Sequence, residues 1–254
     1  MIGEHTQPPP SGDDRPEQVR VGDVVDGVSP VLLAVLESAA VLQGRVPDAV
    51  LVGGSAAALY ARHRDSFDHD HVLADLRDRF DLVLEALERE PDWVLNRAVP
   101  RKILLGQLGD IEAGVRQLRR TVPLEVVEVA LPSGRTVRAP TADETLRIKG
   151  FLITTRNQTR DHLDVAGLAE RYGTSHAAHV LSEIDRYYTD PAHTGTPVAD
   201  QVLRQLAAPA PKDSRTTTRL AGYKRLTPRL QSWDHVVAVL ADVAEAMRTE
   251  GGGR

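Results

Sequence analysis

The sequence predicts an α+β fold, in which a mixed β-sheet with helices is followed by a C-terminal helical domain. The chain has 254 residues, of which 41% are hydrophobic and 26% charged, so it is long and apolar enough to bury a core. Between residues 31 and 139, segments with helical spacing alternate with short strand-like segments. After Pro140 only helical spacing recurs.

The N-terminal half is expected to open with a helix. Val31–Leu42 has a helical stripe of apolar residues, and Ala49–Val52 is a short buried strand. We expect further helices at 56–62 and 75–89, and further strands at 68–73, 103–108, 111–118, 124–131 and 136–139. Ser133-Gly134 is a favourable turn between the last two strands.

The helical half is expected to begin at a capping box, Thr141-Ala-Asp-Glu144, whose side chains satisfy free N–H groups. We expect helices at 142–156, 158–172, 175–188, 197–207 and 232–248, with a loop at 208–219. Residues 1–18 are rich in proline and polar residues and are expected to be a disordered arm. The predicted domains are therefore an α/β domain at 19–140 and a helical domain at 141–250.

Composition excludes several classes of protein. The chain has no cysteine, which rules out a disulfide framework, zinc–thiolate sites and thiol nucleophiles. It has neither an apolar run of ~20 residues nor the basic start of a signal peptide, so we expect a cytoplasmic protein without a membrane partner.

Charge is unevenly distributed along the chain. The net charge is −5, yet residues 97–160 hold twelve Lys or Arg against six Asp or Glu, a local excess of +6. A local basic patch would attract a polyanionic ligand. The alternative is that these charges are scattered and solvated on strands.

A glycine-rich bend and a pair of acids are the clearest indications of a binding site in the sequence. Gly53-Gly54 lets the backbone approach a ligand, the following helix offers N–H groups to an anion, and Ser55 adds a hydroxyl. Asp68 and Asp70 lie on the next strand, whose period of two puts both on one face. Such carboxylates repel unless a cation lies between them, and hard oxygen ligands suit Mg²⁺. Taken singly, the two patterns also fit a simple turn and two solvated acids.

Together, the bend and the acids are what metal-assisted nucleotidyl transfer needs, because one holds a triphosphate and the other holds the metal. Nearby histidines suggest an alternative, a metal-dependent phosphohydrolase with His and Asp ligands. On a strand, however, His69 and His71 point away from Asp68 and Asp70.

A cluster of cations lies in the helical half. On one continuous helix, Lys149, Arg156 and Arg160 would fall within about 20° of one line, with Asp164 about 60° away. Three cations on one face would meet an anion such as a triphosphate or an RNA backbone. The alternative is a break near Asn157, which would leave surface charges on two helices.

The stretch GGSAAALYARHRDSFDHD resembles the nucleotidyltransferase superfamily and, more narrowly, the AbiEii/AbiGii toxin family, which includes the MenT-type toxins. The family pattern GG[ST]-…-HR-x-S-x-D-x-D is matched at Gly53, Gly54, Ser55, His63, Arg64, Ser66, Asp68 and Asp70. The family's later lysine and R-D-x-x-D are matched at Lys149, Arg160, Asp161 and Asp164. The resemblance covers about residues 48–175.

The resemblance implies a nucleotidyltransferase-type sheet domain and a helical domain that completes the active site. Its expected activity is Mg²⁺-dependent transfer of NMP from an NTP to an RNA acceptor, the tRNA 3′ end. It also implies a toxin role, with a cognate antitoxin as partner. A nucleotidyltransferase acting on a small molecule such as an aminoglycoside, and a binding module without catalysis, remain alternatives.

The resemblance also assigns roles to residues. Asp68 and Asp70 bind metal. The nucleotide is bound by a larger set: Gly53, Gly54, Ser55, Arg64, Ser66, Lys149 and Arg160. Either Asp161 or Asp164 completes the catalytic set. A third metal carboxylate from Glu112, Glu125 or Glu128 stays open.

Overall fold

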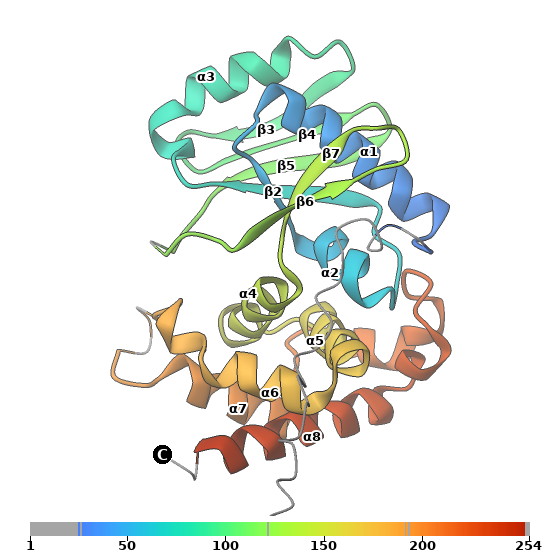
Figure 1. Ribbon diagram of the computed structural model, residues 1–254, viewed down its shortest axis with the longest axis vertical. Coiled ribbons are helices and arrows are strands. Elements are labelled where there is room, and N and C mark those ends of the chain that lie inside the picture. Colours follow the sequence, from blue (N-terminus) through green and yellow to red (C-terminus); the bar gives the residue numbers. More distant parts are fainter. Residues whose placement is uncertain (1–24, 26, 121, 191, 193, 252–254) are drawn as a thin grey trace, which may run out of the picture.

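The chain forms a sheet half and a helical half in the computed structural model, which describes residues 25, 27–120, 122–190, 192 and 194–251 (Figure 1). This confirms the expected fold class, a mixed sheet with helices followed by a helical region. The predicted N-terminal arm at 1–18 lies outside the described residues. The division into domains stays a prediction.

A five-stranded mixed sheet forms the centre of the sheet half. Its strands are β1 (Val50–Val52), β2 (Asp68–Leu73), β3 (Trp93–Val99), β4 (Ile103–Leu108) and β5 (Ile111–Gln117). They are ordered β1-β2-β5-β4-β3, with β2 parallel to β5 and the other neighbours antiparallel. A separate hairpin pairs β6 (Val126–Ala130) with β7 (Thr136–Pro140).

Strand β3 was not predicted, and its position explains why. It is an edge strand with a register shift between Leu95 and Arg97. Such a bulge interrupts the period-two pattern, and an edge strand buries few side chains. Of its seven residues only Trp93 is buried, so the strand gives no clear apolar alternation in the sequence.

The helices of the sheet half are α1 (Pro30–Arg45), α2 (Gly53–Ala61) and α3 (Leu76–Glu88). Helix α1 begins with a proline after the cap Ser29, whose hydroxyl accepts from the Leu32 N–H at 3.1 Å. Residues of α1, α3 and one face of the sheet form a buried core that includes Leu42, Phe80 and Val115. One sheet face is thereby covered.

The helical half contains α4 (Ala142–Thr155), α5 (Thr159–Tyr172), α6 (Thr174–Ser182), α7 (Val198–Ala207) and α8 (Trp233–Gly251). Short 3₁₀ segments are η1 (Ile184–Arg186), η3 (Ser214–Gly222) and η4 (Pro228–Gln231). Two expectations are corrected here. The helix expected at 175–188 ends at Ser182 and resumes as η1, and the loop expected at 208–219 contains the start of η3.

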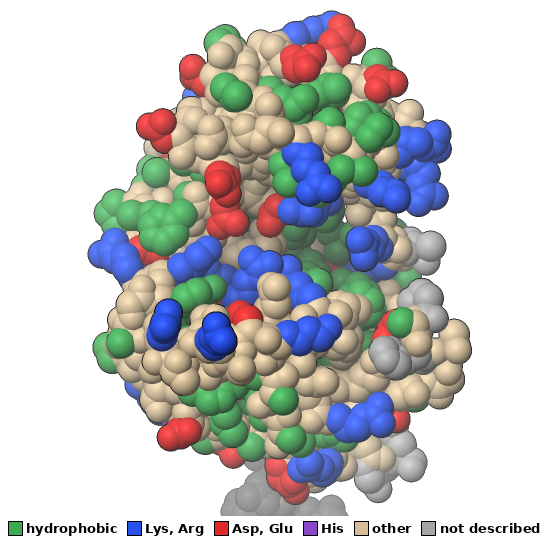
Figure 2. Space-filling model, turned by 180° about the vertical axis from the view of Figure 1, so that it is seen from behind, with side chains coloured by type: hydrophobic (Ala, Val, Ile, Leu, Met, Phe, Trp, Pro, Cys, Tyr) green, Lys and Arg blue, Asp and Glu red, His purple; other side chains and the backbone are tan. Residues whose placement is uncertain are grey.

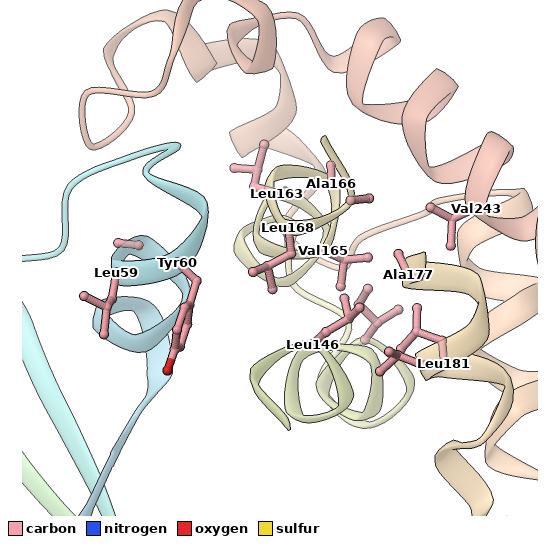
Figure 3. Packing of buried hydrophobic residues seen from close by; sticks show 14 of the residues in the cluster. Leu59, Tyr60, Leu146, Leu163, Val165, Ala166, Leu168, Ala177, Leu181 and Val243 are labelled. Carbon is pink, nitrogen blue, oxygen red and sulfur yellow. The ribbon is translucent and has the colours of Figure 1, made fainter. Parts of the chain in front are cut away.

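The two halves share a second core, which is drawn in Figure 3. Leu59 and Tyr60 of α2 lie opposite Leu146 of α4 and Leu163 of α5. The Tyr60 hydroxyl also donates to the Pro140 carbonyl at 2.6 Å, where β7 ends. Helix α2, which starts at the glycine bend, is therefore held against the helical half.

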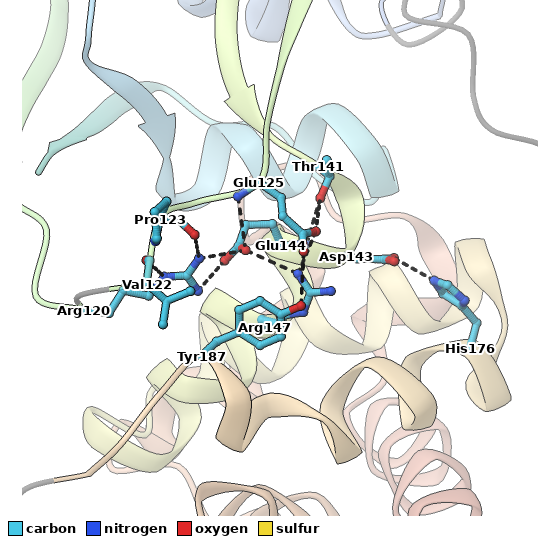
Figure 4. A network of polar contacts seen from close by, with 10 residues as sticks. All are labelled: Arg120, Val122, Pro123, Glu125, Thr141, Asp143, Glu144, Arg147, His176 and Tyr187. Carbon is cyan, nitrogen blue, oxygen red and sulfur yellow. Dashed lines mark hydrogen bonds and ion pairs between the residues drawn. The ribbon is translucent and has the colours of Figure 1, made fainter.

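A polar network also joins the halves (Figure 4). Arg120, which lies between β5 and β6, forms an ion pair with Glu144 of α4 at 2.7 Å. Arg147 of α4 bonds Glu125 at 2.9 Å and lies 4.1 Å from the centre of the Tyr187 ring. The expected capping box at Thr141 is confirmed only in part: its hydroxyl accepts from the Glu144 N–H at 3.1 Å, whereas the Glu144 carboxylate binds the two arginines.

Candidate active site

Strand β2 presents its two acids and its two histidines to opposite faces of the sheet, as predicted. The side chains of Asp68 and Asp70 are 39% and 33% exposed, whereas His69 and His71 are buried. The His69 ring nitrogen lies 3.0 Å from the Ser38 hydroxyl of α1. The histidines belong to the covered face, so they cannot share a ligand with the acids.

The start of α2 lies directly against Asp70. Gly53 has a φ of +78°, and a Cβ built there would lie 3.4 Å from the Asp70 carboxylate. The N-cap, Val52, provides no side-chain cap among the described residues. The helix predicted from residue 56 begins earlier, at Gly53. Because Gly53 lies next to Asp70, the first N–H groups of α2 lie beside the acids.

Gly54 makes room for two side chains that border the acids. A Cβ at this position would lie 2.7 Å from an Arg64 nitrogen and 2.9 Å from the Ser66 hydroxyl. The Ser66 hydroxyl donates to Asp68 Oδ1 at 3.1 Å. The Ser55 hydroxyl donates at 2.5 Å to the Asp68 carbonyl. Both serines thus bind Asp68 itself.

A buried ionic cluster is centred on Asp164 of α5. Arg64 donates to both of its carboxylate oxygens, at 2.8 and 3.1 Å, and Lys149 lies 2.7 Å from one of them. His63 completes the cluster at 2.8 Å, and its ring packs where Gly167 leaves space, because a Cβ there would lie 2.6 Å from it. Burial opposes ionisation of Asp164, but Arg64, Lys149 and His63 outweigh it and hold its pKa well below the usual value.

Asp161 is bound in a similar way. Arg156 donates two hydrogen bonds of 2.5 Å to its carboxylate, and Lys149 Nζ lies 3.9 Å away. Both Asp161 and Asp164 are fully buried, and the Lys149 side chain is only 1% exposed. Lys149 therefore pairs with both buried carboxylates.

Lys149 and Arg160 lie on two helices, so the break near Asn157 that the sequence left open as an alternative is confirmed, as are the separate helices expected at 142–156 and 158–172. Helix α4 ends at Thr155, Asn157 adopts a left-handed φ of 49°, and α5 begins at Thr159. The Asn157 side chain donates to the Ala210 carbonyl, which fixes the break. Two of the cations nevertheless meet, because Lys149 and Arg156 both pair with Asp161. Arg160 instead helps to lower the pKa of Asp68.

Cations from both halves surround the two acids. Arg116 of β5 lies 3.3 Å from Asp70, and Lys224 lies 3.7 Å from Asp68. Burial raises the pKa of Asp68, but its polar and charged neighbours lower it by more, so the pKa lies below its usual value. These neighbours are Lys224, the Ser66 hydroxyl, Arg64 and Arg160. Lys and Arg side chains gather along the hollowed waist between the halves in Figure 2.

Sequence reasoning missed Arg116 and Lys224 as site residues. Lys224 has a left-handed φ of 44° in a segment between η3 and η4, which no periodic pattern marks. Arg116 counted only as part of the basic excess at 97–160. Its position follows from the pairing of β2 with β5, which a single sequence does not reveal.

The three candidate glutamates lie in different places. Glu112 of β5 is paired in register with Asp68 of β2, so its exposed side chain leaves the same face. Glu125 instead binds Arg147, and Glu128 lines a cavity of about 650 Å³ between α1 and the β6–β7 hairpin. Among the described residues, no group of three or more acids, histidines or cysteines is arranged to hold a metal ion.

Solved structures of known proteins are similar to this chain. The nucleotidyltransferase toxin MenT4 from Mycobacterium tuberculosis superposes with a TM-score of 0.54 at 17% identity, over 85% of this chain and 82% of that chain. The fold is nucleotidyltransferase-like. An antigenic nucleotidyltransferase-like protein from Paracoccidioides brasiliensis gives a TM-score of 0.43 at 20% identity, over 56% of this chain and 77% of that chain. No family model matches the sequence.

Curated relatives match only part of the chain. The heme uptake protein MmpL11 of Mycobacterium tuberculosis is 43% identical over 95 residues, which is 37% of this chain and 10% of that protein. MmpL11 of Mycolicibacterium smegmatis, an exporter of mycolic acid-containing lipids, is 37% identical over 133 residues, which is 52% of this chain and 13% of that protein. The chain thus spans about a tenth of their length. Over the part of the chain that the structure describes, no helix has the length and apolar character to span a membrane.

Proposed function

We propose that this protein is a Mg²⁺-dependent nucleotidyltransferase that transfers NMP from an NTP to an RNA acceptor, in particular a tRNA 3′ end. The observation that carries the proposal is the meeting of three features at one place. The two acids of β2 share one face, Gly53 at the start of α2 lies so close to Asp70 that a Cβ there would be 3.4 Å from its carboxylate, and cations from both halves lie beside the acids. A triphosphate and a divalent ion need this combination.

The donor set fits Mg²⁺. Asp68 and Asp70 are hard oxygen ligands, each partly exposed, and Mg²⁺ is commonly bound by one or two carboxylates together with waters and substrate phosphates. We assign the metal to these two residues. The ion would bind phosphate oxygens and lower the charge that develops on them.

The remaining residues act on the nucleotide or hold those that do. No side chain of the described residues caps the start of α2, so the N–H groups at Gly53 and Gly54 would bind phosphate oxygens, and Arg160 and Lys224 would neutralise phosphate charge. The buried Asp164 fixes Arg64 and Lys149 behind this surface. We therefore assign Asp164 a positioning role, because its depressed pKa and full set of partners make it a poor base.

The toxin role, with a cognate antitoxin, rests on the resemblance in the motifs and on the likeness to MenT4, which is itself described as a nucleotidyltransferase toxin. The chain retains each residue of the toxin-family pattern from Gly53 to Asp70. These features support an RNA acceptor over a small molecule, as does the basic excess at 97–160.

Incubation with each radiolabelled NTP, Mg²⁺ and total RNA tests the proposal. We expect one nucleotide to become covalently attached to RNA, with EDTA and Asp68→Asn both abolishing the label. Label that appears only on an added aminoglycoside would replace RNA by a small-molecule acceptor. Release of phosphate without attachment would favour a phosphohydrolase, and attachment undiminished in Asp68→Asn would overturn the metal assignment.

A further inference from the structure

The open face of the sheet continues from the two acids across three more strands. Strand pairing puts Asp70, Gly114, Leu105 and Arg97 in one row, from β2 through β5 and β4 to β3. A Cβ on Gly114 would lie 2.8 Å from the Asp70 carboxylate and 3.0 Å from Leu105, which confirms that both side chains leave this face. The row therefore joins the candidate metal site to the far edge of the sheet.

A second row runs beside the first on the same face. It contains Asp68, Glu112, Gln107 and Val94, and Val94 is 57% exposed. Residues that alternate with these rows, such as Trp93, Leu104 and Val115, are buried in the core under α1 and α3. The described helices thus cover one face and leave these rows open, and Figure 2 shows exposed hydrophobic side chains among charged side chains of both signs on the sheet half.

The two sides of the sheet also differ in charge. Residues 93–119 hold five cations (Arg97, Arg101, Lys102, Arg116 and Arg119) and two acids (Asp110 and Glu112), a net charge of +3. Residues 76–92, which form α3 on the covered side and the turn after it, hold three arginines and six acids, a net charge of −3. Asp68 and Asp70 of β2 also lie on the open face and reduce its excess to +1. The open side is still less negative than the covered side, so a polyanion is favoured on the open side.

We propose that this open face binds the single-stranded end of the RNA acceptor, with its terminal hydroxyl directed to the nucleotide at Asp68 and Asp70. This inference rests on the proposed function and identifies where the acceptor lies. On sheet faces that bind single-stranded RNA, the bases stack on side chains and on guanidinium planes, while cationic side chains contact the phosphates. Leu105 and Val94 supply apolar contacts for bases or riboses, and Arg97 contacts a phosphate.

The width of the face sets the length of RNA that it can bind. Strands β2 and β3 are three strand spacings apart, ~14 Å at ~4.8 Å per spacing. This distance corresponds to about four stacked nucleotides at ~3.4 Å each. An acceptor with a longer single-stranded end therefore reaches Arg97, whereas one with about two unpaired nucleotides does not.

Fluorescence anisotropy with two labelled single-stranded RNAs, of about eight and about two nucleotides, tests the inference on the intact chain. The variants are Arg97→Glu and Val94→Asp, both at exposed positions on the face. The matched control is Arg89→Glu at the C-cap of α3, where the exposed arginine side chain pairs with Glu85 on the covered side. Circular dichroism and the affinity for NTP should be unchanged in all three variants.

We expect Arg97→Glu to weaken binding of the longer RNA about tenfold and to lower the slope of log K against log salt by about 1. Val94→Asp should weaken it by a similar factor, whereas Arg89→Glu and the short RNA should show no difference. Wild-type affinity for the longer RNA in both face variants would overturn the inference. So would a change in oligomeric state alone, since that would make the face an interface between protein copies.

The transfer reaction separates failure of this inference from failure of the proposed function. If no nucleotide is attached to any acceptor, the proposed function fails, although RNA affinity is still measured. If nucleotide is attached and Arg97→Glu leaves the KM for RNA unchanged, the function stands and the acceptor lies elsewhere.

Discussion

The two faces of β2 are built from one short sequence, Asp-His-Asp-His, yet they have opposite properties. One face carries partly exposed acids beside a helix N-terminus and several cations. The other carries buried histidines that pack under α1 and contact each other edge-on at 5.2 Å between ring centres. Because side chains alternate along a strand, the acids of β2 can face a ligand while the histidines that alternate with them pack in the interior.

Helix α5 repeats this separation with helical spacing. Asp161 and Asp164 are three residues apart and both contact Lys149. His162 points elsewhere, with its ring nitrogen 2.8 Å from the Asn157 side-chain oxygen and its ring edge-on to Trp233. The difference between the elements is burial: the acids of β2 are partly exposed, whereas those of α5 are enclosed. Exposed acids can bind a metal, and enclosed acids fix other side chains.

The largest effect is expected at the open face. Asp70→Asn should reduce nucleotide transfer at least ~10³-fold, about 4 kcal/mol in activation free energy, because it removes a proposed metal ligand. The melting temperature should barely change, since the pair with Arg116 is partly exposed and such pairs contribute little. Asp75→Asn, which alters an exposed pair with Arg79, is the matched control. Steady-state kinetics and calorimetry check both statements; a large loss of stability in Asp70→Asn would contradict the separation of roles.

The reverse pattern is expected for Asp164. Asp164→Asn leaves Arg64 and Lys149 as buried cations without their carboxylate, which should cost about 3–4 kcal/mol of unfolding free energy. Urea denaturation measures this value. In the control Asp143→Asn, the lost partner is the half-exposed His176, and the cost should be below about 1 kcal/mol. Equal costs for the two variants would show that the cluster around Asp164 does not stabilise the fold.

The titration of His162 gives a somewhat smaller effect. Burial lowers its pKa from 6.5 to about 4. Between pH 6.5 and about 4, His162 is therefore protonated in the unfolded chain but neutral in the folded chain. Its contribution to the free energy of unfolding is complete above pH 6.5 and is lost as the pH falls toward 4. The loss amounts to about 3 kcal/mol from this residue. His162→Gln, which can keep the bond to Asn157, should flatten the pH dependence of urea unfolding by that amount; an unaltered dependence would contradict the burial effect.

The sequence was sufficient for features that depend on local pattern. The bounds of β2 and β4 were predicted correctly, as were the opposite directions of Asp68 and His69, because period-two alternation determines them. Features that depend on pairing between distant segments were not accessible. The position of Arg116 beside Asp70 requires the β2–β5 register, and β3 was missed because its bulge disrupts the pattern.

The helical half was harder for a different reason. The break near Asn157 was one of two alternatives in the sequence, and it is fixed by a left-handed residue and by a contact with Ala210, far away in sequence. The pattern left open whether Lys149 meets an anionic ligand or lies on the surface, and in the structure two carboxylates from α5 make its burial possible. Charge patterns do not distinguish a buried ion pair from a solvated one, since both use the same residues.

The smallest effect is expected at Gly114, the point where the open face comes closest to Asp70. An alanine Cβ would lie 2.8 Å from the Asp70 carboxylate and 3.0 Å from the Leu105 methyl, and both are ends of side chains that can shift. Gly114→Ala should therefore cost no more than about 1 kcal/mol of stability. Displacement of the carboxylate should lower transfer activity about tenfold. Gly44→Ala, whose Cβ enters open space on α1, is the control; full activity in Gly114→Ala would mean that the position of Asp70 tolerates this shift and would weaken its assignment as a ligand.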